Sequence, residues 1–381
     1  MDTTSLLLAL LRHAVCGIEL NRDAADACTP QNLEQVYALA QKHDLAHLAA
    51  HAVENLSIAE CEPIKSLRKA KMAAIYRYTK LDYELERICS TLDGAGISFM
   101  PLKGTVLRPF YPEAWMRSSC DIDVLVRPEA LQDAVLHLEN AGYRRSGKGH
   151  HDVSLFSPSG VHLELHYSLT DHTDSDPLRE ILDGIWEKAE RKEGADNHYL
   201  MPDSYFYLHH IAHMANHFLR GGCGIRACLD IWILNHRMDA NTAQREALLA
   251  QGGLLAFAKA AEKLAECWFS GQTPDQKTLH FSECVLNGGI YGTGANGAIM
   301  YKAADAKLRI PFHRILIPMD DLRYAYPILD KKPWLMPLCQ VLRWFRLVDI
   351  LRVELKKRAA SRRVSRNTED KTRQLLQYLQ L

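Results

Sequence analysis

The spacing of hydrophobic and polar positions changes twice along this chain, and the two changes divide it into three parts. In the first part, residues 1–92, apolar residues recur at helical intervals, which predicts amphipathic helices. Thr29 followed by Pro30 is typical of an N-cap and a first helical position, and predicts a helix that continues to His43. A longer helical pattern covers residues 70–92 and ends at an Asp-Gly pair.

The second part, residues 93–170, has short runs in which apolar and polar residues alternate, and this pattern predicts strands. Residues 157–160, Ser-Pro-Ser-Gly, predict the turn of a β-hairpin. Residues 128–141 begin with a proline and are followed by Gly142, which predicts a helix between strands. The predicted strands cover residues 97–100, 121–126, 152–156 and 161–167.

The third part, residues 171–381, returns to helical spacing, apart from a glycine-rich stretch at 287–297 that predicts a loop. The predicted helices of this part cover residues 205–219, 225–237, 254–269 and 338–357. We therefore expect an α+β protein, in which a small mixed-sheet core at 93–170 is flanked by an N-terminal helical region at 1–92 and a C-terminal helical domain.

Two acidic residues interrupt an otherwise apolar run at residues 120–126, Cys-Asp-Ile-Asp-Val-Leu-Val. Because side chains alternate between the faces of a strand, Asp121 and Asp123 point the same way, with Cα atoms roughly 6.6 Å apart. Neighbouring carboxylates are costly near a core unless a cation neutralises them. Mg²⁺ prefers oxygen ligands and is commonly held by carboxylates together with substrate phosphates. The pair therefore predicts a divalent-metal site rather than two exposed acids on an edge strand.

A third carboxylate lies on the predicted strand 161–167, where His162, Glu164 and His166 alternate with leucines and so share one face. If this strand lies beside the strand of the aspartates, Glu164 completes a metal site or accepts the proton of an attacking hydroxyl. The alternative is a polar face that is open to water.

The turn Lys103-Gly104-Thr105 follows a predicted strand and precedes a short helical stretch. Glycine lets the backbone approach a phosphate closely, a helix N-terminus favours anions, and lysine adds a point charge. Arg117 and Ser118, which directly precede the acidic strand, are further candidates for contacts with a triphosphate.

These motifs follow one another as Leu102-Lys103-Gly104, Tyr111-Pro112, Arg117, Asp121-Ile122-Asp123 and Leu163-Glu164-Leu165-His166. In this order the chain resembles the bacterial nucleotidyltransferase-like family of the polymerase-β-like nucleotidyltransferase superfamily, most strongly over residues 84–168. The resemblance implies transfer of a nucleoside monophosphate from an NTP to an acceptor hydroxyl with Mg²⁺ or Mn²⁺ as cofactor. ATP is the donor that we expect first.

Residue by residue, the resemblance implies that Asp121, Asp123 and Glu164 are the ligands of a two-metal site. It also implies that Gly104 and Thr105 form the phosphate-binding turn. The superfamily usually has Gly-Ser or Gly-Gly there, whereas this chain has Lys-Gly-Thr, which matches the narrower family.

A histidine-rich helix follows the core. His209 and His213 are four residues apart and share one stripe, and Arg226 and Asp230 have the same spacing on the next predicted helix. Together with His166, we expect these residues to contact the acceptor or the nucleotide. The alternatives are structural histidines with a helical ion pair, or a zinc site on the histidine stripe.

The composition limits the kinds of binding partner that we expect. The 381 residues include 46 Lys and Arg against 46 Asp and Glu, so the net charge is zero. This favours a small molecule or a sugar as acceptor over a nucleic acid, which usually demands a basic surface. The ten cysteines include no CxxC pair, the N-terminus lacks a basic leader, and no apolar run reaches about 18 residues. We therefore expect a cytoplasmic protein without a membrane span.

Residues 344–366 mix aromatic residues with many Arg and Lys, which predicts a solvated basic helix face or a contact with RNA, a membrane surface or an acidic acceptor. Two other functions stay open. A metal-dependent glycosyltransferase also uses Asp-x-Asp, but it normally has a nucleotide-binding α/β unit before that motif. A non-catalytic nucleotide sensor would share the fold, but it need not keep three carboxylates.

Overall fold

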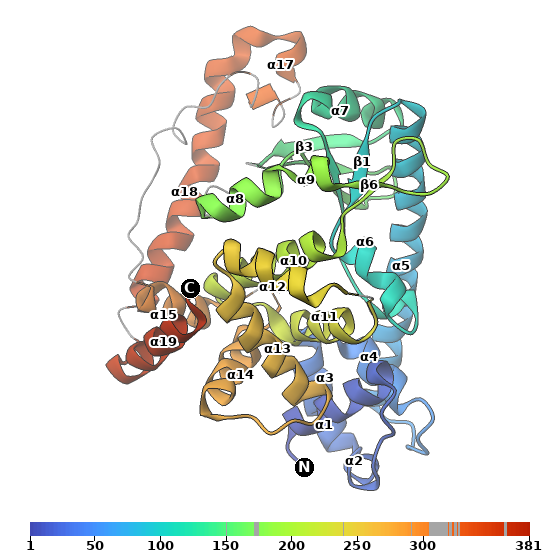
Figure 1. Ribbon diagram of the computed structural model, residues 1–381, viewed down its shortest axis with the longest axis vertical. Helices are drawn as coiled ribbons and strands as arrows, with labels where there is room; N and C mark the ends of the chain where they lie inside the picture. The colour runs from blue at the N-terminus through green and yellow to red at the C-terminus, as the bar shows by residue number, and fades with distance from the viewer. Residues whose placement is uncertain are drawn as a thin grey trace.

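The computed structural model places a small β-sheet among helices (Figure 1). It describes residues 1–149, 151–170, 175–238, 240–290, 292–304, 328–361 and 364–381, with Met319, Leu322, Arg323 and Tyr326 between them. The predicted fold class, α+β with helices on both sides of a mixed-sheet core, is confirmed.

The central sheet is mixed and has five strands. The strands are β1 (Phe99–Pro101), β2 (Asp121–Val126), β3 (Arg144–Lys148), β4 (Asp152–Phe156) and β5 (His162–His166). They lie in the order β1-β2-β5-β4-β3, with β2 and β5 parallel and every other neighbouring pair antiparallel. A separate ribbon pairs β6 (Glu190–Arg191) with β7 (Tyr199–Leu200).

The parallel pair of β2 and β5 decides which side chains meet. Its register places Asp121 opposite His162 and Asp123 opposite Glu164. Opposed residues of neighbouring strands point to the same face, so the polar side chains of both strands gather on one face of the sheet. The apolar residues between them point to the other face.

That apolar face packs against two helices, α5 (Glu62–Gly94) and α7 (Leu131–Asn140). The buried residues of this layer include Ile88, Leu92, Val124, Leu138 and Leu165. Since a slip of one residue in β2 would carry the aspartates into this apolar layer, packing against α5 and α7 also orients the acidic side chains.

Short helices precede α5, which runs from them to the sheet (Figure 1). They are α1 (Thr3–Leu11), α2 (Arg22–Asp26), α3 (Pro30–Lys42) and α4 (Ala46–Val53), with a π-helical turn at Arg12–Cys16. Between β1 and β2 lie α6 (Gly104–Leu107) and 3-10 turns at Arg108–Phe110 and Ala114–Met116, and a further 3-10 turn at Pro128–Ala130 precedes α7.

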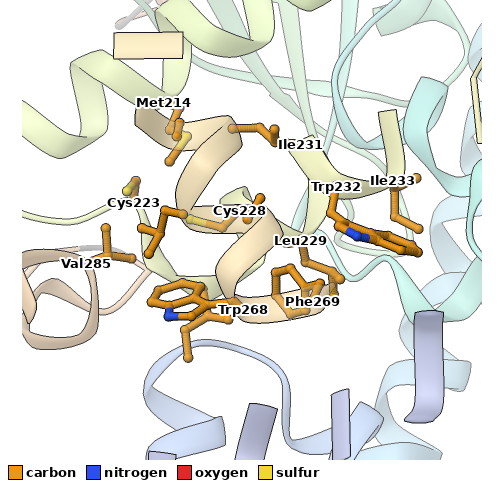
Figure 2. Close-up of a cluster of buried hydrophobic side chains, with 14 of the residues drawn as sticks. Met214, Cys223, Cys228, Leu229, Ile231, Trp232, Ile233, Trp268, Phe269 and Val285 are labelled. Carbon is orange, nitrogen blue, oxygen red and sulfur yellow. The ribbon is translucent and has the colours of Figure 1, made fainter. Parts of the chain in front are cut away.

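The chain after the sheet is helical. Its helices are α8 (Asp176–Asp183), α9 (Ile185–Lys188), α10 (Asp203–Leu219), α11 (Gly224–His236), α12 (Thr242–Gln251), α13 (Leu255–Phe269), α14 (Gln276–Gly288), α15 (Gly294–Ala303), α17 (Ile328–Lys331), α18 (Met336–Ser361) and α19 (Arg366–Leu379), with a 3-10 turn at Pro333–Leu335. One buried cluster joins most of these helices to α1–α4, since it contains Leu10 as well as Leu229, whereas Leu329 of α17 and Cys339 of α18 belong to a separate small cluster. Figure 2 shows part of it, where Leu229 of α11 lies beside Trp268 and Phe269 of α13.

Most predicted elements are present. β2 has the predicted bounds, and α3 begins at Pro30 with Thr29 as its N-cap. β3 was not predicted, because Arg-Arg-Ser-Gly-Lys has no apolar alternation and pairs only at the sheet edge. The proposed domain limits near residues 92 and 170 stay a prediction.

The basic segment predicted at 344–366 lies largely outside the described residues, which exclude residues 362 and 363 and the side chains of 346–358. Its surface role therefore stays a prediction. Among the helices that are described, none combines the length and the apolar character that crossing a bilayer requires.

The predicted loop at 287–297 is wrong at both ends, because α14 extends to Gly288 and α15 begins at Gly294, and it is confirmed for the described residues between these helices. The glycines allow two backbones to cross closely. A Cβ on Gly288 would lie 2.6 Å from the carbonyl oxygen of Gly221, and a Cβ on Gly222 would lie 2.6 Å from that of Gly289. The turn between α10 and α11 is thereby held against the end of α14.

This crossing predicts that Gly222→Ala destabilises the protein by about 1–3 kcal/mol, because backbone atoms block the added methyl group. Urea denaturation of both proteins measures the difference. Gly94→Ala is the matched control, since its Cβ would have no atom within 4 Å, and it should leave stability unchanged or slightly raised. Equal stability of the two variants would contradict the crossing.

Candidate functional site

The polar face of β2 and β5 carries the three predicted carboxylates. Asp121 and Asp123 point from β2, and Glu164 points from the neighbouring position on β5. Two overlapping groups have ligand atoms within 4.8 Å of one another: Asp121 with His162 and Glu164, and Asp123 with Glu164 and His166. The expectation that strand 161–167 lies beside the acidic strand is therefore confirmed.

Asp123 is buried and has two basic side chains as hydrogen-bond partners. Its Oδ1 atom accepts a hydrogen bond from Lys103 Nζ at 2.7 Å and another from His166 Nε2 at 2.9 Å. Burial would raise the pKa of Asp123, but Lys103 and His166 outweigh burial and hold this pKa well below its ordinary value. Asp123 is therefore an anion that the protein itself already neutralises.

Asp121 is the opposite case. Among the described residues its carboxylate has no hydrogen bond and no ion pair within 4 Å. Burial, followed by the charges of Asp123 and Glu164, raises the pKa of Asp121. A half-buried carboxylate beside two others, without a partner of its own, is an open position for a cation.

Lys103 comes from the turn between β1 and α6, with φ 47° and ψ −119°. Besides Asp123, its Nζ atom lies 3.7 Å from Glu164 Oε2. Burial would lower the pKa of Lys103, but Asp123 and Glu164 outweigh burial and raise this pKa. The lysine therefore stays charged among the carboxylates.

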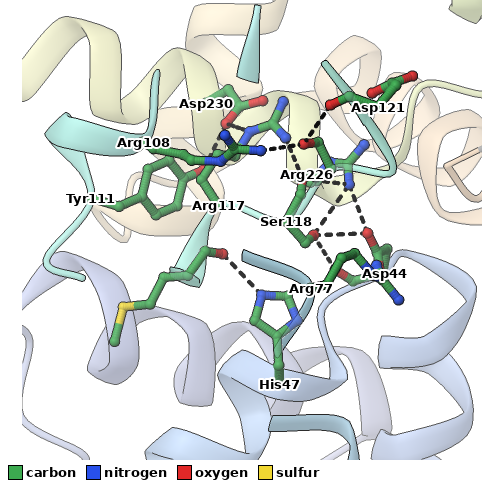
Figure 3. Close-up of polar contacts among 12 residues, drawn as sticks. Asp44, His47, Arg77, Arg108, Tyr111, Arg117, Ser118, Asp121, Arg226 and Asp230 are labelled. Carbon is green, nitrogen blue, oxygen red and sulfur yellow. Dashed lines mark hydrogen bonds and ion pairs between the residues drawn. The ribbon is translucent and has the colours of Figure 1, made fainter. Parts of the chain in front are cut away.

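Arg117 and Asp230 form a buried ion pair (Figure 3). Asp230 Oδ1 accepts hydrogen bonds from Arg117 Nε and from the Tyr111 hydroxyl, each at 2.7 Å. Burial would raise the pKa of Asp230, but Arg117 and His210 outweigh burial and lower it. The pair ties α11 to the chain segment that leads into β2.

Arg226 braces the same segment from α11 (Figure 3). Its Nη1 atom donates to Asp44 Oδ2 at 2.7 Å and to the backbone oxygen of Ser118 at 3.0 Å. The Ser118 hydroxyl also donates to Asp44 Oδ2 at 2.7 Å. The predicted spacing of Arg226 and Asp230 therefore marks two separate contacts to the segment before β2 rather than one helical ion pair.

Helix α10 presents its histidines to the acidic face. His209 and His213 line the same cavity as the carboxylates, and His217 extends the row, with its Nε2 atom 3.2 Å from that of His213. Burial, followed by the charge of Lys103, lowers the pKa of His209 to about 3. Burial, followed by the charges of Arg220 and Lys103, lowers the pKa of His217 to about 4. These imidazoles are therefore neutral at physiological pH and can both donate and accept hydrogen bonds.

The cavity between the sheet and helices α10 and α11 has a volume of about 420 Å³. The predicted residues among those that line it are Lys103, Gly104, Arg117, Asp121, Asp123, Glu164, His166, His209, His213, Arg226 and Asp230. Thr105 and Ser118 are not among the described residues that line it, and their predicted contacts with phosphate stay a prediction.

Sequence reasoning did not assign His162, His151 and Arg220 to the site. His162 completes the Asp121 group, and its strand parity with Glu164 was the available indication. His151 stacks on His166 with ring centroids 5.4 Å apart, and Arg220 lines the cavity just beyond α10. Neither of these two residues lies in a pattern that a single sequence makes visible.

A mixed sheet with three carboxylates facing a cavity that is also lined by histidine, lysine and arginine side chains is typical of proteins that bind metal-complexed phosphates. The sequence model of a family described as "Uncharacterised nucleotidyltransferase" matches residues 29–270, and the chain belongs to this family. A search of the curated proteins finds no match.

The buried pair predicts that Asp230→Asn lowers the free energy of unfolding by about 3 kcal/mol at pH 7, because Arg117 stays buried without its counter-charge. The folded pKa of Asp230 lies below its ordinary value of 3.8, so its contribution is complete above that pH. The loss should shrink as the pH falls below about 4. Urea denaturation at several pH values measures it.

Asp26→Asn is the matched control, because Asp26 pairs with Arg22 at the exposed surface. It should change stability by less than about 1 kcal/mol at every pH. An Asp230→Asn variant as stable as this control would show that the buried pair contributes little to the fold.

Proposed function

We propose that the protein transfers a nucleoside monophosphate from an NTP to an acceptor hydroxyl, as a member of the polymerase-β-like superfamily. The attacking oxygen approaches the α-phosphate in line, and pyrophosphate leaves. The observation that carries the proposal is the convergence of Asp121, Asp123 and Glu164 in one cavity, with Asp121 still lacking a partner among the described residues. Membership of a nucleotidyltransferase family supports it.

The donor set fits divalent cations, since it offers three carboxylates and ligand atoms that lie within 4.8 Å of one another. Asp121, Asp123 and Glu164 would hold two Mg²⁺ or Mn²⁺ ions. Bound there, the ions would supply charge neutralisation on the phosphates and an acceptor hydroxyl of lowered pKa.

The residues around the carboxylates position the donor. Lys103 supplies a positive charge for a phosphate oxygen, and Gly104 leaves room for the phosphates beside it. Arg117, Thr105 and Ser118 are proposed to complete the triphosphate site. Arg117, which lines the cavity, accordingly needs little reorganisation to receive the donor, since Asp230 holds its guanidinium; the Ser118 hydroxyl donates to Asp44.

The acceptor side is formed by α10. Glu164 is proposed to take the proton of the attacking hydroxyl, since it is the residue that both groups of ligands share. The neutral His209 and His213 can hydrogen-bond uncharged hydroxyls without demanding an anion. A cavity of about 420 Å³ and a net charge of zero favour a small molecule or a sugar as acceptor.

The first prediction concerns binding. An NTP with Mn²⁺ or Mg²⁺ should raise the free energy of unfolding by about 2.7 kcal/mol at a hundredfold excess over its dissociation constant. Thermal unfolding with each NTP, with UDP-glucose, and with or without metal measures the effect. The double variant Asp121→Asn, Asp123→Asn should lose the shift.

Other outcomes of this experiment identify the rival functions. A larger shift with UDP-glucose than with any NTP would favour a glycosyltransferase. A metal-dependent shift with an NTP, without turnover on any hydroxyl acceptor, would favour a nucleotide sensor. The absence of a shift with every nucleotide would contradict the proposal.

The second prediction concerns turnover. Asp123→Asn should reduce NMP transfer by about a hundredfold or more while the protein stays folded, because it removes a charged ligand at similar volume. Release of pyrophosphate from labelled NTP with a panel of sugars and small alcohols measures the reaction. Asp133→Asn, at an exposed position of α7, is the matched control and should keep full activity. Undiminished transfer by folded Asp123→Asn would exclude this mechanism.

A further inference from the structure

The two groups of candidate ligands are unequally occupied by the protein's own charges. Asp123 has the ammonium of Lys103 at 2.7 Å and the imidazole of His166 at 2.9 Å. Asp121 has no ion pair among the described residues. Both groups share Glu164, so the difference between them comes from the contacts of Lys103 and His166 with Asp123.

We propose that Lys103 is a resident cation that keeps the Asp123 position closed until a nucleotide arrives. The free protein would then bind a divalent cation only at Asp121, His162 and Glu164. This inference rests on the proposed function, because it assigns an order to the loading of the same site.

The first argument is that Lys103 lies on the ligand atoms themselves. Its Nζ atom lies 2.7 Å from Asp123 Oδ1, which belongs to the second group alone, and 3.7 Å from Glu164 Oε2, which both groups share. Like charges a few ångströms apart repel strongly in a partly buried site. The side chain of Lys103, 21% exposed, must leave before another cation can occupy its place.

The second argument is that Lys103 has an alternative partner only when a nucleotide is present. A lysine ammonium on its flexible four-carbon stem can pass from a carboxylate to a phosphate oxygen. Its side chain already lines the cavity that would hold the triphosphate. Movement of Lys103 onto the phosphates would uncover Asp123 at the moment when the donor arrives.

The third argument is that the Asp121 group is formed in advance. The Nε2 atom of His162 lies 2.5 Å from Ser154 Oγ, and its ring stacks on Phe156 with centroids 4.9 Å apart. Partners of this kind orient a ligand imidazole. An imidazole beside two carboxylates suits Mn²⁺ better than Mg²⁺, so Mn²⁺ is the appropriate probe.

The test counts Mn²⁺ bound to the full chain by equilibrium dialysis and electron paramagnetic resonance, without nucleotide. Wild type should bind about one Mn²⁺ per chain, and Lys103→Met about two, because the uncharged side chain of similar length uncovers the second position. Lys71→Met is the matched control, since Lys71 is 16% exposed and pairs with Glu54 outside the cavity. It should behave as wild type.

Two results would overturn the proposal: two Mn²⁺ bound by nucleotide-free wild type, or an unchanged count in folded Lys103→Met. If Lys103→Met does not fold, the Mn²⁺ counts of Asp121→Asn and Asp123→Asn test the proposal instead. Asp121→Asn should lose the nucleotide-free Mn²⁺, whereas Asp123→Asn should retain it, and the reverse pattern would contradict the assignment.

A last measurement adds a non-hydrolysable ATP analogue to wild type, which should raise the count to about two in the bound complex. A bound analogue that leaves the count at one would contradict the role of Lys103. Failure of every analogue to bind would instead contradict the proposed function. In either case, the Mn²⁺ counts measured without nucleotide test the proposed role of Lys103.

Discussion

The site depends on the parallel pairing of β2 with β5. This pairing places Asp123 opposite Glu164, and no other strand contact in the described sheet would bring a third carboxylate to the aspartates. Parallel strands require a crossover connection, and here α7 and the β3–β4 hairpin provide it. The same α7 covers the apolar face, so the element that makes the pairing possible also fixes which face carries the acids.

The local patterns of the sequence predicted most of the elements and the three carboxylates that the structure brings together. Alternation in residues 120–126 and 161–167 predicted two strands whose acidic side chains share a face, and their adjacency could only be assumed. What the sequence did not contain was the effect of distant packing. Arg-Arg-Ser-Gly-Lys becomes β3 because it pairs with β4. Glycines in the stretch 287–297 allow a close crossing of two backbones, and the sequence alone does not distinguish such glycines from those of a loop. The charged partner of Arg117, Asp230, likewise comes from α11, more than a hundred residues later.

The buried ion pairs of this protein position the segment before β2 more than they stabilise the fold. Pairs such as Arg117 with Asp230 cost desolvation free energy that their attraction roughly offsets. They do, however, fix the segment before β2 at two points, Asp230 and Asp44, from two different parts of the chain. A reacting group held in this way loses little freedom when substrate binds. The neutral histidines of α10 complete the arrangement, since they add hydrogen-bonding capacity to the cavity without adding charge.

The backbone of Lys103 shows where the fold accepts strain. Its φ of 47° with ψ −119° is a conformation that residues with a Cβ rarely adopt, and such residues persist only where the surroundings hold them. The backbone oxygen of Lys103 accepts hydrogen bonds from the N–H groups of Val106 and Leu107, and the ammonium contacts two carboxylates; together these contacts hold the residue. A glycine at this position would relieve the strain, but it would also remove the Lys103 ammonium. Among the described residues, no other Lys or Arg forms an ion pair with the acids of β2 and β5. The strained turn is therefore best explained by the charge that it carries into the site.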